Sequence, residues 1–462
     1  MMGKYMFILC LASCYIIVSS KVNLKCDSTN SNDACRCDIA IDPLTNFPVS
    51  EAVCEYLELE DFPSLDLIGP INSLDLSHNN LKVLKHLESI RNDGPIFILK
   101  ICHNSIVEID ENFFFDYFPN ITTLDMSFNN LTALKSTALF DKLNDLQDLN
   151  LSFNQIGIIQ DGMFANLKNL LNIDLSYNPL FNILQDPNAL LDKLGINENI
   201  VKFNLNNVGV TRIHEHCWNK FKNMEHLSVA DNPLTEIPQT SASLEYLDIS
   251  GTNITDIHEN YLKYSKLKVL IMSRMQNLRS IPKYAFYNLG NLEEFSLTDS
   301  LDLQDFNALS FGALDRRTFP RHLRKFNLAR NRIRTLNESY QFLFHETEYL
   351  DVSFNKWECN CDVLWMKDLD YLVRRKNYIR CAAPGDTVNK LVLKLQPMDV
   401  PDCYPEIYGK KFHQTTLVFM ILLVFALIAI IVYLCLYSPS WSTKIGSTRV
   451  SPDSPYSINN ES

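Results

Sequence analysis

One phrase of this sequence decides its fold: Leu74-Asp75-Leu76-Ser77-His78-Asn79. The phrase recurs in altered form about every 24 residues, as far as Leu350-Asp351-Val352-Ser353-Phe354-Asn355, and such a period is typical of a solenoid of stacked repeats. Because a solenoid grows by adding repeats, a length of 462 residues does not imply several compact domains. The common frame is L-x-L-x-x-N-x-L, and its alternating leucines predict a short strand with apolar side chains turned inward.

The frame fits about twelve segments of the chain. They are 74–81, 99–106, 124–131, 149–156, 173–180, 203–210, 227–234, 247–254, 270–277, 295–302, 326–333 and 350–357. Stacking these strands predicts one long parallel sheet on the concave side, with each asparagine bonding the turn that follows its strand. Other residues stand where this asparagine is expected in four repeats: Val208, Thr252, Met275 and Ser300. Aromatic residues between the strands are expected to fill the core near the convex side: Phe114, Phe140, Phe164, Trp218, Phe286 and Phe342.

Two apolar segments predict that the chain is secreted and anchored in a membrane. A basic start at Lys4, an apolar run and small residues before Lys21 are typical of a secretory signal peptide over residues 1–20. A second uncharged run predicts a transmembrane helix over 415–437, because about 20 apolar residues cross a bilayer. The charges that flank this span are neutral or slightly contrary to the positive-inside rule, so the signal peptide decides the orientation. We therefore expect a single-pass type I protein of the plasma membrane with its N-terminus outside.

Cysteines cluster on either side of the repeats. Four precede the first repeat and four follow the last one: Cys26, Cys35, Cys37 and Cys54, then Cys359, Cys361, Cys381 and Cys403. Because a solenoid needs caps over its end repeats, these cysteines of a secreted chain predict two disulfides per cap, not zinc sites. Four cysteines permit three pairings, among which the residues alone do not choose. Cys102 and Cys217 lie outside both caps and are expected to be unreactive free thiols. At Cys102 the alternative is a reactive thiol or an intermolecular disulfide bridge.

The sequence around these cysteines resembles the caps of extracellular leucine-rich-repeat proteins. The segments that carry the resemblance are Cys35-Arg36-Cys37 with Cys54 and Pro63, and Asn355-Lys356-Trp357-Glu358-Cys359-Asn360-Cys361 with Trp365, Cys381, Pro384 and Cys403. The resemblance implies an α/β leucine-rich-repeat solenoid with disulfide-bonded caps at both ends. It also implies first-to-third and second-to-fourth pairing, that is Cys26–Cys37, Cys35–Cys54, Cys359–Cys381 and Cys361–Cys403. The wide gap after Cys26 departs from the family pattern.

Together these signals predict seven consecutive segments. They are a signal peptide (1–20), an N-terminal cysteine cap (21–63), the repeats (64–355), a C-terminal cysteine cap (356–404), a juxtamembrane linker (405–414), one transmembrane helix (415–437) and a short disordered cytoplasmic tail (438–462). The tail is too short to fold as a signalling domain.

Composition and motifs argue against several classes of function. A formal net charge of −12 and a pI of about 5.4 disfavour nucleic acid as a partner, because nucleic acid needs a basic footprint. The chain has no G-x-S-x-G, no H-E-x-x-H and no paired acids in a distinct domain, so we expect neither an enzyme nor a cofactor. His214, Glu215 and His216 precede Cys217, but a single surface loop without a distant ligand does not predict a metal site.

One column of residues is a candidate ligand-binding surface. The position before the frame asparagine is aromatic in the first five repeats, and we call these residues the aromatic ladder: His78, His103, Phe128, Phe153 and Tyr177. Strands lie about 4.8 Å apart, so the ladder is expected to be about 19 Å long. Exposed aromatic residues in a row are good anchors for a protein partner. The alternative is that Ser-Phe-Asn and Ser-Tyr-Asn are common sequences in such repeats and have no special role in binding.

Five sequons predict N-linked glycans on the ectodomain and agree with secretion. They lie at Asn120, Asn130, Asn150, Asn253 and Asn337. Asn150 stands between Leu149 and Leu151, so a glycan there would block part of the concave face; the alternative is an unoccupied sequon.

The architecture is similar to that of single-pass leucine-rich-repeat adhesion molecules and receptors, the connectin, capricious and Toll ectodomain group. This resemblance implies a cell-surface molecule that binds a protein ligand or co-receptor, with homophilic binding as one option. Without a signalling domain, the chain is expected to act by adhesion, by presenting a ligand or through a partner receptor. The alternatives are an innate-immune Toll-like co-receptor or decoy and a structural scaffold of the matrix, because fold does not fix function.

Overall fold

The structure is a computed structural model of the chain. It describes residues 23–26, 35–41, 48–67, 71–85, 90–92, 94–183, 193–212, 218, 220–258, 261–312, 322–344 and 347–437. The chain divides into two compact units, Met1–Leu395 and Gln396–Ser462, and each is described by itself. The signal peptide predicted at 1–20 and the tail predicted at 438–462 lie outside the described residues.

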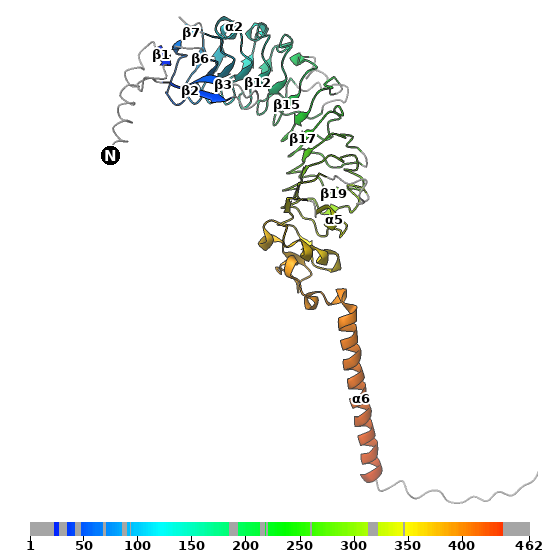
Figure 1. The fold of residues 1–462 in the computed structure, drawn as a ribbon. Coiled ribbons are helices and arrows are strands. Elements are labelled where there is room, and N and C mark those ends of the chain that lie inside the picture. Colours follow the sequence, from blue (N-terminus) through cyan, green and yellow to red (C-terminus); the bar gives the residue numbers. More distant parts are fainter. Residues whose placement is uncertain are drawn as a thin grey trace, which may run out of the picture. The chain divides into compact units, whose positions relative to one another are not determined.

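A 14-stranded sheet runs through the first unit (Figure 1). Its strands in spatial order are β2 (Arg36–Ile41), β3 (Pro48–Val53), β5 (Ser73–Asp75), β8 (Ile98–Lys100), β10 (Thr123–Asp125), β12 (Asp148–Asn150), β14 (Asn172–Asp174), β15 (Lys202–Asn204), β16 (His226–Ser228), β17 (Tyr246–Asp248), β18 (Val269–Ile271), β20 (Glu294–Ser296), β22 (Lys325–Asn327) and β23 (Tyr349–Asp351). Only the first pair, β2 with β3, is antiparallel. The twelve strands of this sheet from β5 to β23 each overlap the start of one segment that fits the repeat frame. The predicted parallel-sheet solenoid of about twelve repeats is therefore confirmed.

The register of the sheet repeats from strand to strand. Leu74 pairs with Leu99 and Leu99 with Leu124, so the first frame leucine always faces the same position of the next repeat. These leucines and the second frame leucines are buried, because alternate residues of a strand point to opposite faces. The inward face therefore forms one continuous core along the stack.

Shorter elements lie on the outer edge of the stacked repeats, opposite the long sheet (Figure 1). Three parallel strand pairs are found there: β6 (Val83–Leu84) with β9 (Glu108–Ile109), β11 (Ala133–Leu134) with β13 (Ile158–Ile159), and β19 (Ser280–Ile281) with β21 (Asp305–Phe306). The helices α2 (Phe113–Tyr117), η1 (Thr137–Leu139) and α5 (Tyr340–Phe344) accompany them. Near the N-terminus, β1 (Asn23–Cys26), β4 (Ser64–Leu67) and β7 (Ile90–Asn92) form a separate parallel sheet.

The aromatic core series is buried as expected, with one exception. Phe114, Phe140, Phe164, Trp218 and Phe286 are buried, but Phe342 is 41% exposed, so its predicted place in the core is wrong. Helix α5 explains the difference. Residues four apart share one face of a helix, so burying Tyr340 and Phe344 turns Phe342 outward.

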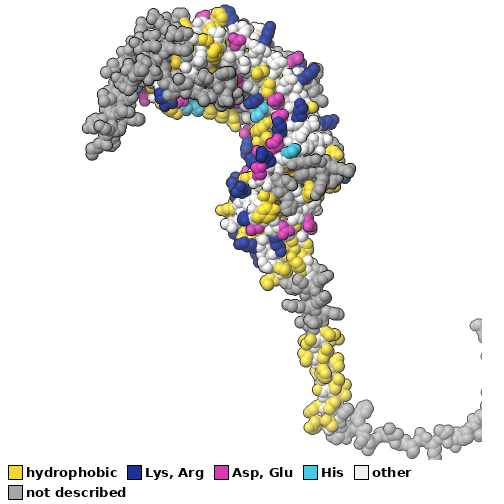
Figure 2. Space-filling view, in the orientation of Figure 1, with side chains coloured by type: hydrophobic (Ala, Val, Ile, Leu, Met, Phe, Trp, Pro, Cys, Tyr) yellow, Lys and Arg dark blue, Asp and Glu magenta, His cyan; other side chains and the backbone are white. Residues whose placement is uncertain are grey.

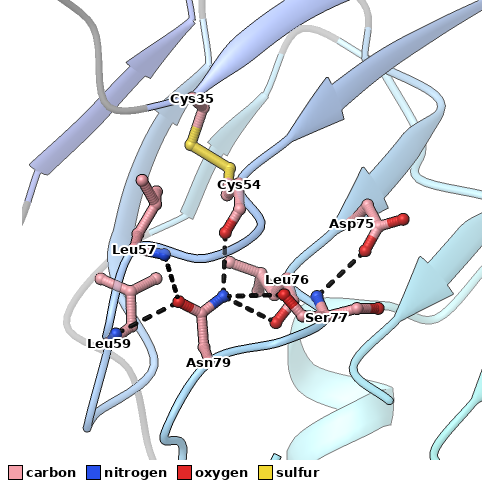
Figure 3. Close-up of a disulfide and its surroundings, with 8 residues drawn as sticks. All are labelled: Cys35, Cys54, Leu57, Leu59, Asp75, Leu76, Ser77 and Asn79. Atoms are coloured by element: carbon pink, nitrogen blue, oxygen red, sulfur yellow. Dashed lines mark hydrogen bonds between the residues drawn. A yellow bond between two sulfur atoms is a disulfide. The ribbon is translucent and has the colours of Figure 1, made fainter. Parts of the chain in front are cut away.

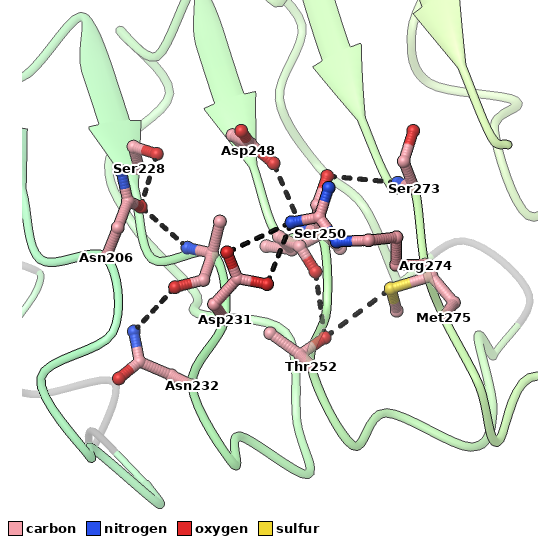
Figure 4. Close-up of polar contacts among 12 residues, drawn as sticks. Asn206, Ser228, Asp231, Asn232, Asp248, Ser250, Thr252, Ser273, Arg274 and Met275 are labelled. Carbon is pink, nitrogen blue, oxygen red and sulfur yellow. Dashed lines mark hydrogen bonds and ion pairs between the residues drawn. The ribbon is translucent and has the colours of Figure 1, made fainter. Parts of the chain in front are cut away.

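Buried frame asparagines tie each repeat to the one before it. Asn79 bonds five backbone groups (Figure 3): its amide nitrogen donates to the carbonyls of Cys54, Leu76 and Ser77, and its Oδ1 accepts from the N–H groups of Leu57 and Leu59. Asn129 repeats the arrangement two repeats further on, with its Oδ1 accepting from the N–H of Ile106. At the position of Thr252 the side chain reaches only the carbonyl of Ile249 and the sulfur of Met275 (Figure 4).

Cysteine caps close both ends of the first unit. Cys35 and Cys54 form a disulfide beside the first asparagine (Figure 3), and Cys359 forms one with Cys381. The C-terminal cap also contains β24 (Trp357–Glu358), η2 (Cys361–Leu369), η3 (Lys376–Tyr378), β25 (Cys381–Ala383) and η4 (Val392–Lys394). Its core holds Trp357 and Trp365, and the Trp365 indole N–H donates to the carbonyl of Leu336 at 3.0 Å.

The described part of the second unit, up to Tyr437, contains two short turns and one long helix: η5 (Pro397–Asp399), η6 (Pro401–Cys403) and α6 (Pro405–Tyr437). Helix α6 begins at Pro405, so the segment expected to be a juxtamembrane linker is helical. Among the described residues, Thr416–Leu434 is the one helical stretch long and apolar enough to cross a membrane. Figure 2 shows this stretch as a hydrophobic surface without charged side chains.

Candidate functional site

The structure stacks all five rings of the aromatic ladder. The ring centroids lie 4.3 Å apart for His78 and His103, 4.1 Å for His103 and Phe128, 4.1 Å for Phe128 and Phe153, and 4.2 Å for Phe153 and Tyr177. The planes of neighbouring rings differ by 12° or less. The sequence therefore identified five side chains that the fold brings into one continuous stack.

Local backbone geometry explains why the rings line up. Each ladder residue has a left-handed conformation with φ between 52° and 57°, which turns the chain out of its strand. The N–H of Phe128 donates to the carbonyl of Ser152, and the N–H of Phe153 donates to that of Ser176. These bonds hold each repeat in register with the next. Identical backbone turns in register then place the rings face to face.

A sixth ring, which the repeat frame does not predict, extends this stack. Tyr56, from the N-terminal cap, stacks on His78 with centroids 4.6 Å apart and is 69% exposed. Its φ of 57° matches that of the ladder residues, and its N–H donates to the carbonyl of His78. The cap lacks the repeat frame at this point, so the sequence carries no positional signal for Tyr56.

A shallow groove runs beside the ladder. The ladder residues line this groove together with Asn130 and Gln155. The frame asparagines Asn104, Asn129 and Asn154 line it as well. Phe128 and Phe153 are each 40% exposed, so the groove combines accessible ring edges with amide groups. Such a surface offers apolar contact and hydrogen bonds to the same partner.

The same column changes character after Tyr177. The residues with left-handed backbone at the matching position of the following repeats are Asn207, Asp231, Gly251, Arg274, Asp299 and Arg330. Arg274 reaches across the repeat of Gly251 to bond both carboxylate oxygens of Asp231, at 2.8 and 3.0 Å (Figure 4). A Cβ at Gly251 would lie 2.2 Å from Asp231 Oδ1, so glycine is what leaves room for this ion pair. The column becomes aromatic again at Phe354, whose ring stacks on Tyr378.

A second aromatic pair lies on the sheet itself and was not anticipated. His226 on β16 stacks on Tyr246 on β17, with centroids 4.0 Å apart. Burial, assisted by the positive charge of Lys202, lowers the pKa of His226 to about 4, and Asp174 opposes this shift. His226 is therefore neutral at physiological pH. Both residues directly precede the first frame leucine of their repeat, but the neighbouring residues of that column, Lys202 and Val269, are not aromatic and give no sign of a stack.

The predicted glycan acceptors differ in their surroundings. Asn120, Asn253 and Asn337 are exposed, and Asn130 is half-buried at the groove. Asn150 lies on β12, and its Oδ1 accepts from both the N–H and the hydroxyl of Ser152. The structure thus places Asn150 on the sheet, where its side chain is hydrogen-bonded to Ser152, the third residue of its own sequon.

The cysteine predictions fall into three groups. The disulfides Cys35–Cys54 and Cys359–Cys381 are two of the pairs that the family resemblance implies, and Cys361 and Cys403 are each disulfide-bonded. Cys102 is a free thiol 3.1 Å from the hydroxyl of Ser77, and burial raises its pKa. The side chains of Cys26 and Cys37 lie outside those described, as does all of the 213–217 segment with His214, Glu215, His216 and Cys217. Among the described residues, no group of three or more His, Cys, Asp or Glu side chains could hold a metal ion.

Comparison with known families supports the repeat architecture. A family model described as "Leucine rich repeat" matches residues 97–156 and 119–180. A second, described as "BspA type Leucine rich repeat region (6 copies)", matches residues 196–315. The fold is a leucine-rich-repeat solenoid.

Individual relatives are distant. Osteomodulin of Bos taurus is 29% identical over 198 residues, which are 39% of this chain and 44% of osteomodulin. Osteomodulin of Rattus norvegicus is 28% identical over 225 residues, 43% of this chain and 50% of that protein. The chain therefore spans half or less of the length of these relatives.

Solved leucine-rich-repeat structures share the fold at low identity. A chain from the octameric complex of Latrophilin 3, Unc5D and FLRT2 is 19% identical with a TM-score of 0.50, covering 80% of this chain and 99% of that one. The mouse RP105/MD-1 complex gives 19% identity and a TM-score of 0.51, covering 71% of this chain and 54% of that one. At these identities the likeness establishes the fold alone.

Proposed function

We propose that this protein is a cell-surface recognition molecule whose ectodomain binds a protein partner along the aromatic ladder. The observation that carries the proposal is the stack of rings from His78 to Tyr177, whose three central rings, His103, Phe128 and Phe153, are exposed. The fold does not require these rings, because Asp231, Gly251 and Arg274 occupy the same backbone position farther along. The repeat fold therefore forms without an aromatic residue at this backbone position.

The ladder has the properties of a binding hot spot. Each ring stacks on at least one neighbouring ring, so a partner does not have to immobilise flexible side chains on binding. Aromatic side chains supply most of the contact energy in many protein interfaces, and amides at the groove wall provide directional hydrogen bonds. Two similar solved structures are complexes with other proteins, RP105 with MD-1 and FLRT2 with Latrophilin 3 and Unc5D, which supports a protein partner.

The membrane part of the proposal rests on the second unit. The apolar stretch Thr416–Leu434 would anchor the chain, and the signal peptide would place the repeats outside the cell, as in a type I plasma-membrane protein. The disulfide-bonded cysteines agree with an extracellular location. The chain would then act in adhesion or as a receptor or co-receptor, without enzymatic chemistry of its own.

A cell-mixing experiment tests this function. Non-adhesive cells that express the full-length protein are mixed with differently labelled parental cells, and clusters are scored. Clusters of expressing cells alone would indicate homophilic adhesion, and clusters that recruit parental cells would indicate a widespread surface ligand. Absence of both would leave a co-receptor or decoy role, or a matrix scaffold. Soluble residues 21–410 would then be tested for binding to a panel of cell surfaces, and failure to bind any of them would contradict the proposal.

A further inference from the structure

Asn130 and the aromatic ladder line the same groove. Phe128 and Asn130 flank the buried Asn129 in the sequence, and all three line the groove. In the next repeat Phe153 and Gln155 flank Asn154 in the same way. A group attached to Asn130 would therefore begin in the groove that the rings line, two residues along the chain from Phe128.

Asn130 is also a chemically suitable glycan acceptor. It begins the sequon Asn130-Leu131-Thr132, and Thr132 is exposed. Its Oδ1 accepts from Gln155 Nε2 at 3.4 Å, a contact that does not involve Nδ2, the atom that carries an N-linked glycan. Transfer from a lipid-linked oligosaccharide diphosphate would form the Nδ2–C1 bond. The C1–O bond to the diphosphate would break, the amide would lose a proton and the lipid diphosphate would leave.

Among the predicted acceptors, Asn130 is the one that lines this groove in the described structure. Asn120 lies with Asp116 and Phe118 at a different depression. Asn253 and Asn337 are exposed on repeats beyond the ladder, and Asn150 projects from the sheet at β12. Position, not merely the sequon, therefore distinguishes Asn130 from the others.

We propose that an N-linked glycan on Asn130 covers the groove and masks the aromatic ladder. A sugar ring presents C–H groups that pack on the edges of Phe128 and Phe153, and hydroxyls that bond the amide of Gln155. Occupancy or trimming of this glycan then sets how much of the ladder a partner reaches. The biological consequence rests on the proposed function, whereas the masking itself does not.

Hydroxyl-radical footprinting of the full-length protein in detergent micelles tests the masking. Glycopeptide mass spectrometry first establishes occupancy, and radical labelling is then compared with Asn130→Gln and Thr132→Ala, which remove the same glycan by different changes. Asn253→Gln is the matched control, since it removes a glycan away from the ladder. Tyr371, 69% exposed in the C-terminal cap, is the internal reference.

Both Asn130→Gln and Thr132→Ala are expected to raise labelling of Phe128 and Phe153 about twofold, because a covering group no longer excludes solvent from the rings. The control and Tyr371 should not change. Unchanged labelling of the two phenylalanines, or an Asn130 peptide that carries no glycan, would overturn the proposal. If labelling rises while cell clustering stays the same in the mixing assay, the masking stands and the proposed role of the ladder in recognition fails.

Discussion

The ring of Phe128 stacks on the ring of Phe153 with centroids 4.1 Å apart and planes 8° apart, although the two residues belong to different repeats. Neither ring is buried, since each is 40% exposed. The contact is therefore a property of the surface, and it results from the identical left-handed turns that precede Asn129 and Asn154. The repeat geometry thus preorganises this aromatic surface, which is the central feature of the molecule.

Removing a ring from the middle of the stack should destabilise the protein modestly. Phe153→Ala deletes contacts with Phe128 and Tyr177, each stack being worth about 0.5–1.5 kcal/mol, and partial exposure keeps the total near 1–2 kcal/mol. Urea unfolding of the purified protein measures the loss. Phe181→Ala removes a 51% exposed ring outside the ladder and should cost less than about 0.5 kcal/mol. Equal costs for both variants would argue against a stabilising stack.

Removing a frame asparagine should cost more. Asn129→Ala leaves the carbonyls of Ile101, Met126 and Ser127 and the N–H of Ile106 without the side chain that bonds them. Buried groups that lose their partners cost about 1–3 kcal/mol each, with partial relaxation, so we expect a loss of about 2–4 kcal/mol. Chemical denaturation checks this value. Thr252→Asn, which installs the missing asparagine, should be neutral or stabilising, and a strong destabilisation there would contradict the account.

Gly251 should not tolerate a side chain. Gly251→Ala adds a Cβ against Asp231 Oδ1 at a φ of +65°, so we expect a loss of about 1–3 kcal/mol and disruption of the Asp231–Arg274 pair. A double-mutant cycle with Asp231→Gly separates the steric part from the backbone strain. The cost of Gly251→Ala should shrink in the Asp231→Gly background. An unchanged cost would assign the whole effect to backbone conformation.

Stability should fall on acidification in a way that depends on His226. Burial lowers the pKa of folded His226 to about 4, below its ordinary value of 6.5, so the unfolded chain takes up the proton first. The contribution of neutral His226 is therefore fully present above pH 6.5 and is lost as the pH falls toward 4. Unfolding free energies between pH 7 and pH 4.5 should decline less steeply for His226→Gln than for the unmodified protein. Identical slopes for His226→Gln and the unmodified protein would refute the assignment.

The strands, the buried asparagines and the ladder could be predicted because all three repeat with the frame. A leucine such as Leu124 faces its counterparts Leu99 and Leu149 in the sheet, so sequence period translates directly into spatial register. The pairing of Cys35 with Cys54 followed only from the family resemblance, since spacing permits other pairings.

The remaining features depend on contacts that the frame does not encode. Tyr56 joins the stack from a cap without repeats, and Arg274 reaches Asp231 across an intervening glycine. The frame aligns His226 with Tyr246 in the sheet, but the stacking of this isolated pair depends on the two side chains alone. Phe342 was misplaced because the outer segments vary in structure, and here helix α5 selects Tyr340 and Phe344 for the core.

The central claim is that the aromatic ladder is the recognition surface. Its most direct test repeats the cell-mixing assay with Phe128→Ala/Phe153→Ala, and with Phe354→Ala/Tyr378→Ala as a control that removes a stacked, exposed pair near the C-terminal cap. Surface expression of the variants is matched, and attachment is scored against the cells that the unmodified protein recruits. We expect the ladder variant to lose attachment, since hot-spot residues cost about 2 kcal/mol or more each, and the control to retain it. Attachment by the ladder variant equal to that of the unmodified protein would contradict the account.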